Sequence, residues 1–237
     1  MTLQSTVAAN QGFGVVGEIV FEGPQRATPG VIKHGTAADI VVGRAFTIDT
    51  SDGTYRPGGT GPFGGILANP KGLSSIGTSA GGPLAPTLTV PTGTVGEFCT
   101  TGIILTAPTN AATIGDDVVY DNTTGELSAL ANSTFTGVIA VTTGVLTVSG
   151  ANAAASIGVG SVVTGTGVPA GTYVTARLTG TGGNGTFQTN IVTAVASFAD
   201  GVATSVAPSG KTRVPAAKVT RYNNAAAALT VVSLNHN

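Results

Sequence analysis

Glycine interrupts this sequence so often that only short regular elements can form between the interruptions. The chain contains 36 glycines among 237 residues, and they separate segments in which apolar and hydroxyl-bearing residues alternate. A period of two is typical of half-buried strands, and intervening Gly, Pro, Asn and Asp are typical of turns. The pattern predicts an all-β fold, a sandwich or barrel of the jelly-roll kind. The clearest predicted strands are residues 18–21, 40–48, 87–90, 102–105, 117–120 and 219–222.

Three turn sequences refine this prediction. Asp52-Gly53 follows an apolar strand, and residues 122–125 (Asn-Thr-Thr-Gly) lie between two more, so both sites favour hairpins. Residues 58–65 contain five glycines around Pro62 and Phe63, which predicts a loop that presents or buries one aromatic ring.

Charged residues are unusually few, at 9% of the chain against roughly 25% in an average soluble domain. Between residues 134 and 203 only Arg177 and Asp200 are charged, and Gly, Thr, Val and Ala dominate. We therefore expect a main β domain formed by residues 1–133 and 204–237, with residues 134–203 as a small inserted β lobe. Surfaces of hydroxyls and amides lose little side-chain entropy when another protein covers them, so the composition suits assembly.

The charge pattern gives no support for nucleic-acid or membrane partners. The net charge is −1, and Lys and Arg are not clustered. The longest apolar run, residues 225–232, is far shorter than the roughly 20 residues of a spanning helix. The first eleven residues lack a basic start and an apolar core, so we expect no signal peptide and assembly in a cytoplasm.

Catalytic, cofactor and metal sites are not predicted. The two histidines, His34 and His236, are far apart, and Cys99 is the single cysteine, expected to be a buried, inert thiol. Residues 12–17 match the G-x-G-x-x-G pattern, but a strand-like segment follows instead of the helix that a dinucleotide site requires.

Acidic residues gather only at Asp116, Asp117 and Asp121, beside a predicted hairpin where Asp is a common turn residue. The cluster lacks the spacing of a calcium loop, although the sequence leaves cation binding open. It also offers no acid pair that would favour a glycosidase.

Several segments taken together resemble the structural cement, or decoration, proteins of tailed-bacteriophage capsids. Residues 134–203 lie outside that pattern and resemble a small β module of phage virion proteins. The segments that carry the resemblance to cement proteins are residues 11–18, 23–26, 42–47, 58–72, 86–90, 114–120, 124–127 and 214–219.

The resemblance implies a non-enzymatic virion protein on the outer capsid surface. Such a protein would bind the assembled major capsid protein shell and bridge capsomers, as a homo-oligomer, a dimer or a trimer. Arginine and aromatic residues are common interface anchors, so the candidate contacts are large side chains in turns or glycine-rich segments. These candidates are Arg26, Arg44, Arg56, Phe63 and Lys71.

Two readings compete with this one. The chain could instead be a tail or fibre module, or an adhesin that binds host glycans. An adhesin would be expected to expose aromatic residues over a sugar, whereas this chain lacks Trp and only 5% of its residues are aromatic. For the candidate side chains, the alternative is that Phe63 fills the core and the cations are simply solvated.

Overall fold

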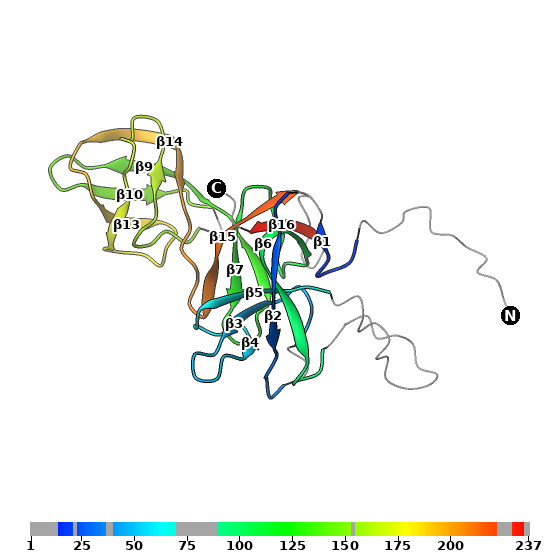
Figure 1. Ribbon diagram of the computed structural model, residues 1–237. Helices are drawn as coiled ribbons and strands as arrows, with labels where there is room; N and C mark the ends of the chain where they lie inside the picture. The colour runs from blue at the N-terminus through cyan, green and yellow to red at the C-terminus, as the bar shows by residue number, and fades with distance from the viewer. Residues whose placement is uncertain are drawn as a thin grey trace.

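The computed structural model describes residues 14–20, 23–36, 40–69, 90–152, 155–221 and 229–234 (Figure 1). All regular elements in these ranges are strands, which confirms the all-β prediction, and they form two curled sheets. No helix in the described part of the chain is long and apolar enough to cross a membrane.

The larger sheet has ten strands in the order β4-β3-β5-β6-β16-β15-β7-β8, with β1 and β2 also paired to β6. The long strand β6 connects its two halves, because its first half pairs with β2 and β5 and its second half with β1 and β16. The strands are β1 (Ile19–Val20), β2 (Arg26–Val31), β3 (Ala45–Ile48), β4 (Tyr55–Pro57), β5 (Phe63–Leu67), β6 (Val95–Thr106), β7 (Asp117–Asp121), β8 (Leu127–Leu130), β15 (Lys211–Arg221) and β16 (Thr230–Leu234).

This sheet encloses two apolar clusters. In the first half, Tyr55 stacks on Phe98 with ring centroids 4.1 Å apart, and Phe46 packs against Phe98. A parallel bridge between Ile32 and Tyr55 brings the end of β2 to β4, so these strands curl around the cluster. The second cluster contains Tyr120, lies chiefly among β6, β7, β8, β15 and β16, and also includes Ala45 and Ile66.

The Tyr55 ring explains two of the glycines. A Cβ at Gly30 would lie 2.2 Å from the Tyr55 ring, and a Cβ at Gly64 would lie 2.6 Å from it. The ring therefore needs the space that both glycines leave. Gly64 belongs to β5, so the loop predicted for residues 58–65 is wrong beyond residue 62. Its glycines serve close packing in a strand there.

The smaller sheet has six strands in the order β11-β14-β9-β10-β13-β12. Its edge strands are joined as well, because Val163 N–H donates to Thr172 O and Val174 N–H donates to Ser161 O, each at 2.9 Å. The sheet therefore closes into a small barrel around Phe135, Leu146, Phe187 and Phe198. Its strands are β9 (Ser133–Ile139), β10 (Val145–Ser149), β11 (Val163–Thr164), β12 (Val174–Arg177), β13 (Gly185–Thr189) and β14 (Val195–Ala203).

The barrel leaves and rejoins the larger sheet at one place. Ser133, the first residue of β9, is the cross-strand partner of Ala203, the last residue of β14. Ser205 Oγ lies 2.9 Å from Ser133 Oγ and donates to Ala131 O at 2.7 Å, which holds the two connecting segments together. Strands β9 to β14 thus span the segment for which an inserted lobe is predicted. That this lobe is a domain separate from the larger sheet stays a prediction.

Local turn chemistry predicts the hairpins correctly. β3 and β4 pair across residues 49–54, and Gly53 has a φ of 71°. β7 and β8 pair across residues 122–126, and Gly125 has a φ of 73°.

Of the predicted strand at residues 87–90, only Val90 belongs to the described residues.

Candidate functional site

Four of the five predicted interface residues lie in the described chain. Arg26 is exposed at the start of β2, whereas Arg44, Arg56 and Phe63 lie on or beside β3, β4 and β5. Lys71 lies outside the described residues. That these residues contact the capsid or another copy of the chain stays a prediction.

Arg44 joins two distant parts of the larger sheet. Its Nη2 lies 2.7 Å from Glu126 Oε1, and its Nη1 donates to Thr124 O at 3.2 Å. The backbone strengthens the same junction, because Ala45 N–H donates to Gly125 O at 2.8 Å. With its side chain only 18% exposed, Arg44 chiefly fastens β3 to the β7–β8 hairpin.

Phe63 is half-buried at the start of β5. It packs against the second apolar cluster, and its ring centroid lies 6.2 Å from that of Tyr120. These contacts favour a packing role for Phe63 over that of a free anchor.

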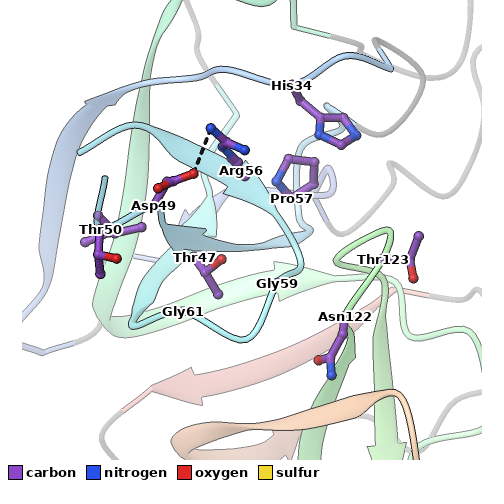
Figure 2. Close-up of a pocket in the computed structure, with 11 residues that line it drawn as sticks. His34, Thr47, Asp49, Thr50, Arg56, Pro57, Gly59, Gly61, Asn122 and Thr123 are labelled. Atoms are coloured by element: carbon purple, nitrogen blue, oxygen red, sulfur yellow. Dashed lines mark ion pairs between the residues drawn. The ribbon is translucent and has the colours of Figure 1, made fainter. Parts of the chain in front are cut away.

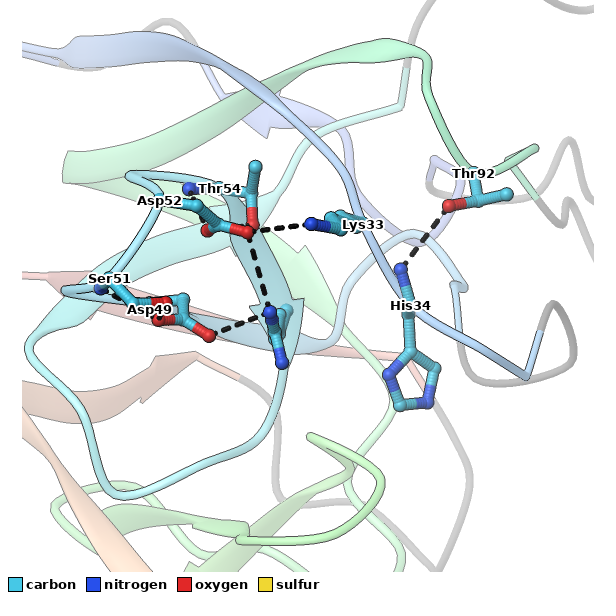
Figure 3. A network of polar contacts seen from close by, with 8 residues as sticks. Lys33, His34, Asp49, Ser51, Asp52, Thr54 and Thr92 are labelled. Atoms are coloured by element: carbon cyan, nitrogen blue, oxygen red, sulfur yellow. Dashed lines mark hydrogen bonds and ion pairs between the residues drawn. The ribbon is translucent and has the colours of Figure 1, made fainter.

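Arg56 lies in a network of charges with Asp49 and Asp52 of the β3–β4 hairpin, and Figure 3 shows these two aspartates. Arg56 Nη2 lies 2.7 Å from Asp49 Oδ2 and 3.5 Å from Asp52 Oδ2, and Lys33 Nζ lies 2.8 Å from Asp52 Oδ2. The Arg56 side chain is 42% exposed. The network therefore holds an exposed guanidinium in one orientation, which lowers the entropy lost if a partner binds it.

The two aspartates of this network are held in their ionised form. A hydrogen bond from Lys33, followed by bonds from Thr54, lowers the pKa of Asp52 well below its ordinary value. Hydrogen bonds from Ser51 lower the pKa of Asp49. Both carboxylates consequently remain charged throughout the neutral range, and the network keeps its geometry there.

An open pocket of about 530 Å³ lies beside this network (Figure 2). It forms where the loop after β4 meets the β7–β8 turn, and Gly59 N–H donates to Asn122 O at 2.7 Å across that junction. Gly58 has a φ of 65°, and a Cβ there would lie 2.7 Å from Asp121 O, so this approach requires glycine. The lining residues are His34, Thr47, Ile48, Asp49, Thr50, Arg56, Pro57, Gly59, Gly61, Asn122 and Thr123.

The pocket offers hydrogen-bonding groups and two opposite charges, and its chemistry suits the binding of a polar group. His34 is partly exposed at its rim, and its backbone N–H donates to Thr92 Oγ1 at 3.2 Å (Figure 3). Of the four described interface candidates, Arg56 alone lines this pocket. The other lining residues come from three separate segments, and no local sequence signal brings those segments together.

The acidic cluster is occupied by internal partners. Asp117 Oδ2 lies 2.8 Å from Arg213 Nη1, and its Oδ1 lies 2.9 Å from Lys218 Nζ. Asp116 accepts the Thr113 N–H, and Asp121 accepts backbone N–H groups of its own turn, which lower its pKa. Among the described residues no group of three or more His, Cys, Asp or Glu is arranged to hold a metal ion.

The surroundings of Cys99 and of residues 14–17 in the glycine pattern are those of structural residues. Cys99 is fully buried in β6, and burial raises the pKa of its thiol to about 11, so it is protonated at neutral pH. Of residues 12–17, only those from Gly14 onward are described; they lead directly into β1, and Gly17 N–H donates to Leu105 O at 2.8 Å. A strand follows where a dinucleotide site would need a helix.

Comparison with known proteins identifies the family. The sequence profile described as "Structural cement protein (E217 gp24/Pam3 gp6)" matches residues 3–160. Among solved structures, a chain of "The capsid of Myoviridae Phage XM1" is similar, with a TM-score of 0.46 and 13% sequence identity, covering 100% of this chain and 99% of that chain. A search of curated proteins found no match.

These findings define the class of the protein, which is an all-β structural protein of bacteriophages. The chain belongs to the structural cement protein family. The matched residues include the described strands β1 to β10, and the match ends inside the six-stranded sheet.

Proposed function

We propose that this protein binds the outer surface of the assembled major capsid protein shell and bridges neighbouring capsomers. It stabilises the head without catalysing a reaction. The observation that carries the proposal is the family match over residues 3–160, which includes most of the larger sheet. Assembly in the host cytoplasm and a final place on the virion follow from the same proposal.

The mechanism is linkage between binding and assembly. A protein that binds the assembled shell more tightly than its separate subunits stabilises the shell in proportion to occupancy. A homo-oligomer, a dimer or a trimer, would present several weak contacts together, and the high effective concentration would raise the total affinity. The shell would then resist opening without any strong single contact.

The surface of the protein supports contact through shape rather than charge. Only 9% of residues are charged, and Arg44 and Asp117 already form ion pairs within the chain. Arg56 is the charged candidate whose side chain is both exposed and oriented by its neighbours. We therefore expect moderate salt to weaken attachment little, since screening acts mainly on exposed charge pairs.

The test compares heads with and without the protein. Particles that lack it are heated with increasing amounts of purified protein, and genome release is followed by fluorescence of a DNA-binding dye. We expect the release temperature to rise with occupancy and then to saturate. Failure to bind the shell, or binding with an unchanged release temperature, would contradict the proposal.

A further inference from the structure

The six-stranded lobe is attached to the larger sheet by two short connecting segments. Residues 131–132 lead into β9, and residues 204–210 lead from β14 to β15. In Figure 1 the lobe lies to one side of the larger sheet. No strand of one sheet pairs with a strand of the other in the described residues, and each apolar cluster there takes its side chains from one sheet. Because a large apolar interface is what usually prevents two such units from moving, the direction of the lobe depends on polar contacts at the connecting segments.

Hydrogen bonds tie the second connecting segment to the lobe. Ser133 Oγ accepts the N–H of Ser156 at 2.9 Å, and Val206 N–H donates to Ser156 O at 2.8 Å. The hydroxyl of Ser156 also donates to Val206 O at 3.1 Å. Ser205, the residue before Val206, is buried, and its Oγ lies 2.9 Å from Ser133 Oγ. The chain around Ser205 therefore moves with the lobe.

Arg213 joins this part of the chain to the larger sheet. Its Nη2 donates to Ser205 O at 2.5 Å, and its Nη1 lies 2.8 Å from Asp117 Oδ2. Asp117 begins β7 and is the cross-strand partner of Leu130, the last residue of β8 before the chain enters the lobe. The planar guanidinium thus spans the junction, and its N–H groups have fixed relative directions.

A second bond at the junction has a different effect. Ser205 Oγ donates to Ala131 O at 2.7 Å, and Ala131 belongs to the first connecting segment. This bond relates the two connecting segments to each other rather than to the larger sheet. Arg213 lies in β15 and Asp117 in β7, so their contact relates Ser205 to strands of the larger sheet.

We propose that the lobe is a hinged arm and that Arg213 is the positioning residue that holds this arm in one direction. The connecting segments form the hinge, since hinges are a few residues between elements that absorb a change in backbone angles. The bond from Arg213 to Ser205 O fixes the arm, and its loss lets the arm rotate about residues 131–132 and 204–210. This property belongs to the chain by itself and does not depend on capsid binding.

Pulsed electron paramagnetic resonance on the purified full-length protein tests the hinge. Spin labels at Val95→Cys in β6 and Val192→Cys in the lobe report the distance between the two sheets. Both native side chains are exposed, at 58% and 62%, whereas the free Cys99 is buried and remains unlabelled. Labels at Val159→Cys and Val192→Cys, both in the lobe, form the internal control pair. Each pair is measured with Arg213 and with Arg213→Met.

Lys218→Met is the matched variant. Lys218 Nζ lies 2.9 Å from the other oxygen of the same carboxylate, Asp117 Oδ1, and donates to Gly115 O in the larger sheet at 3.1 Å. Asp117 loses one cation in either variant, but Arg213→Met also removes the bond to Ser205 O. The comparison therefore separates loss of charge pairing from loss of the contact with the lobe.

We expect Arg213→Met to broaden the distance distribution between the sheets about twofold or more, because the lobe then rotates on two short segments. Lys218→Met should leave this distribution unchanged, and the pair within the lobe should not change in either variant. An unchanged distribution in Arg213→Met, or equal broadening in Lys218→Met, would overturn the proposal. Broadening within the lobe would also overturn it, since Arg213 would then support the fold of the lobe rather than its direction.

Arg213→Lys provides a second test that does not depend on how well Arg213→Met folds. Lysine keeps a cation beside Asp117 but lacks the guanidinium fork that reaches both partners. We expect the distribution between the sheets to broaden in this variant as well. A distribution identical to that of the unmodified chain would overturn the proposal.

Discussion

The two sheets of this protein keep their edges from unwanted pairing in different ways. The larger sheet covers its edge strand β8 partly with a side chain: Asn110 donates to Ala129 O and accepts from Ala129 N–H, both at 2.8 Å, beside a backbone bond from Thr109 N–H to Leu127 O. Pro29 interrupts the donors of β2, which pairs with β6. The smaller sheet instead joins its own edges, β11 and β12, by backbone hydrogen bonds. Closure removes the open edges that charges and prolines otherwise protect.

This difference explains how the lobe is stabilised with almost no charged residues. Its two charged residues bond within the barrel, Arg177 to Ile157 O and Asp200 to the Thr166 hydroxyl and N–H. The larger sheet uses ion pairs between distant segments, such as Arg44 with Glu126 and Asp117 with Arg213. Closed backbone pairing thus stabilises the lobe, and long-range ion pairs help to join the strands of the larger sheet.

The largest effect should come from removing the lobe. Replacing residues 134–202 with Asn-Gly would join Ser133 to Ala203 through a two-residue hairpin, the loop length that suits cross-strand partners. We expect the shortened chain to fold as a β protein, because the larger sheet has its own apolar clusters and keeps the bond from Ser205 to Ala131. Circular dichroism and cooperative urea unfolding would measure this.

The reciprocal experiment uses residues 131–206 alone as the control, which should fold as a barrel around Phe187. Loss of cooperative unfolding in the shortened chain would show that the two sheets share one folding unit. The predicted division at residues 133 and 204 would then be wrong.

A smaller loss of stability is expected when one carboxylate is neutralised in each sheet, and the larger sheet should lose more. Asp117→Asn removes the ion partner of both Arg213 and Lys218, and the Asp117 side chain is only 8% exposed. We expect a loss of about 2 kcal/mol in unfolding free energy, below the cost of breaking a fully buried pair because both cations reach solvent. Asp200→Asn at an exposed position of β14 in the lobe is the matched change and should cost less. Urea midpoints of both variants would measure the difference, and equal losses would contradict it.

Local features of this fold could be predicted from sequence. The hairpins at Gly53 and Gly125 follow from turn residues between alternating segments, and the composition change near residue 133 coincides with the start of β9. These signals lie within a few residues of the structure that they specify. The all-β fold follows from the same short-range pattern.

Contacts between segments that are distant in the chain could not be predicted from the sequence. Closure of the barrel depends on β11, a strand of two residues, whose partner lies across a glycine-rich loop. The pocket unites His34, Arg56 and Asn122 from three segments, and Arg44 meets Glu126 across 82 residues. Such contacts are fixed by how the whole sheet curls, so composition and turn chemistry could name Arg44 and Phe63 as large side chains but could not assign their packing roles.

The smallest effect should come from relieving the strain at Thr142 in the lobe, a β-branched residue with a φ of 72°. Asn visits the left-handed region far more readily than a β-branched residue, so Thr142→Asn should stabilise the barrel by about 0.5–1 kcal/mol. The backbone bond from residue 142 N–H to Val192 O needs no threonine side chain and should remain. Thr143→Asn is the control, since Thr143 is not among the non-glycine residues with positive φ. Thermal unfolding should show a rise of a few degrees for Thr142→Asn alone. An unchanged or lower midpoint would mean that closure of the barrel fixes this loop without strain.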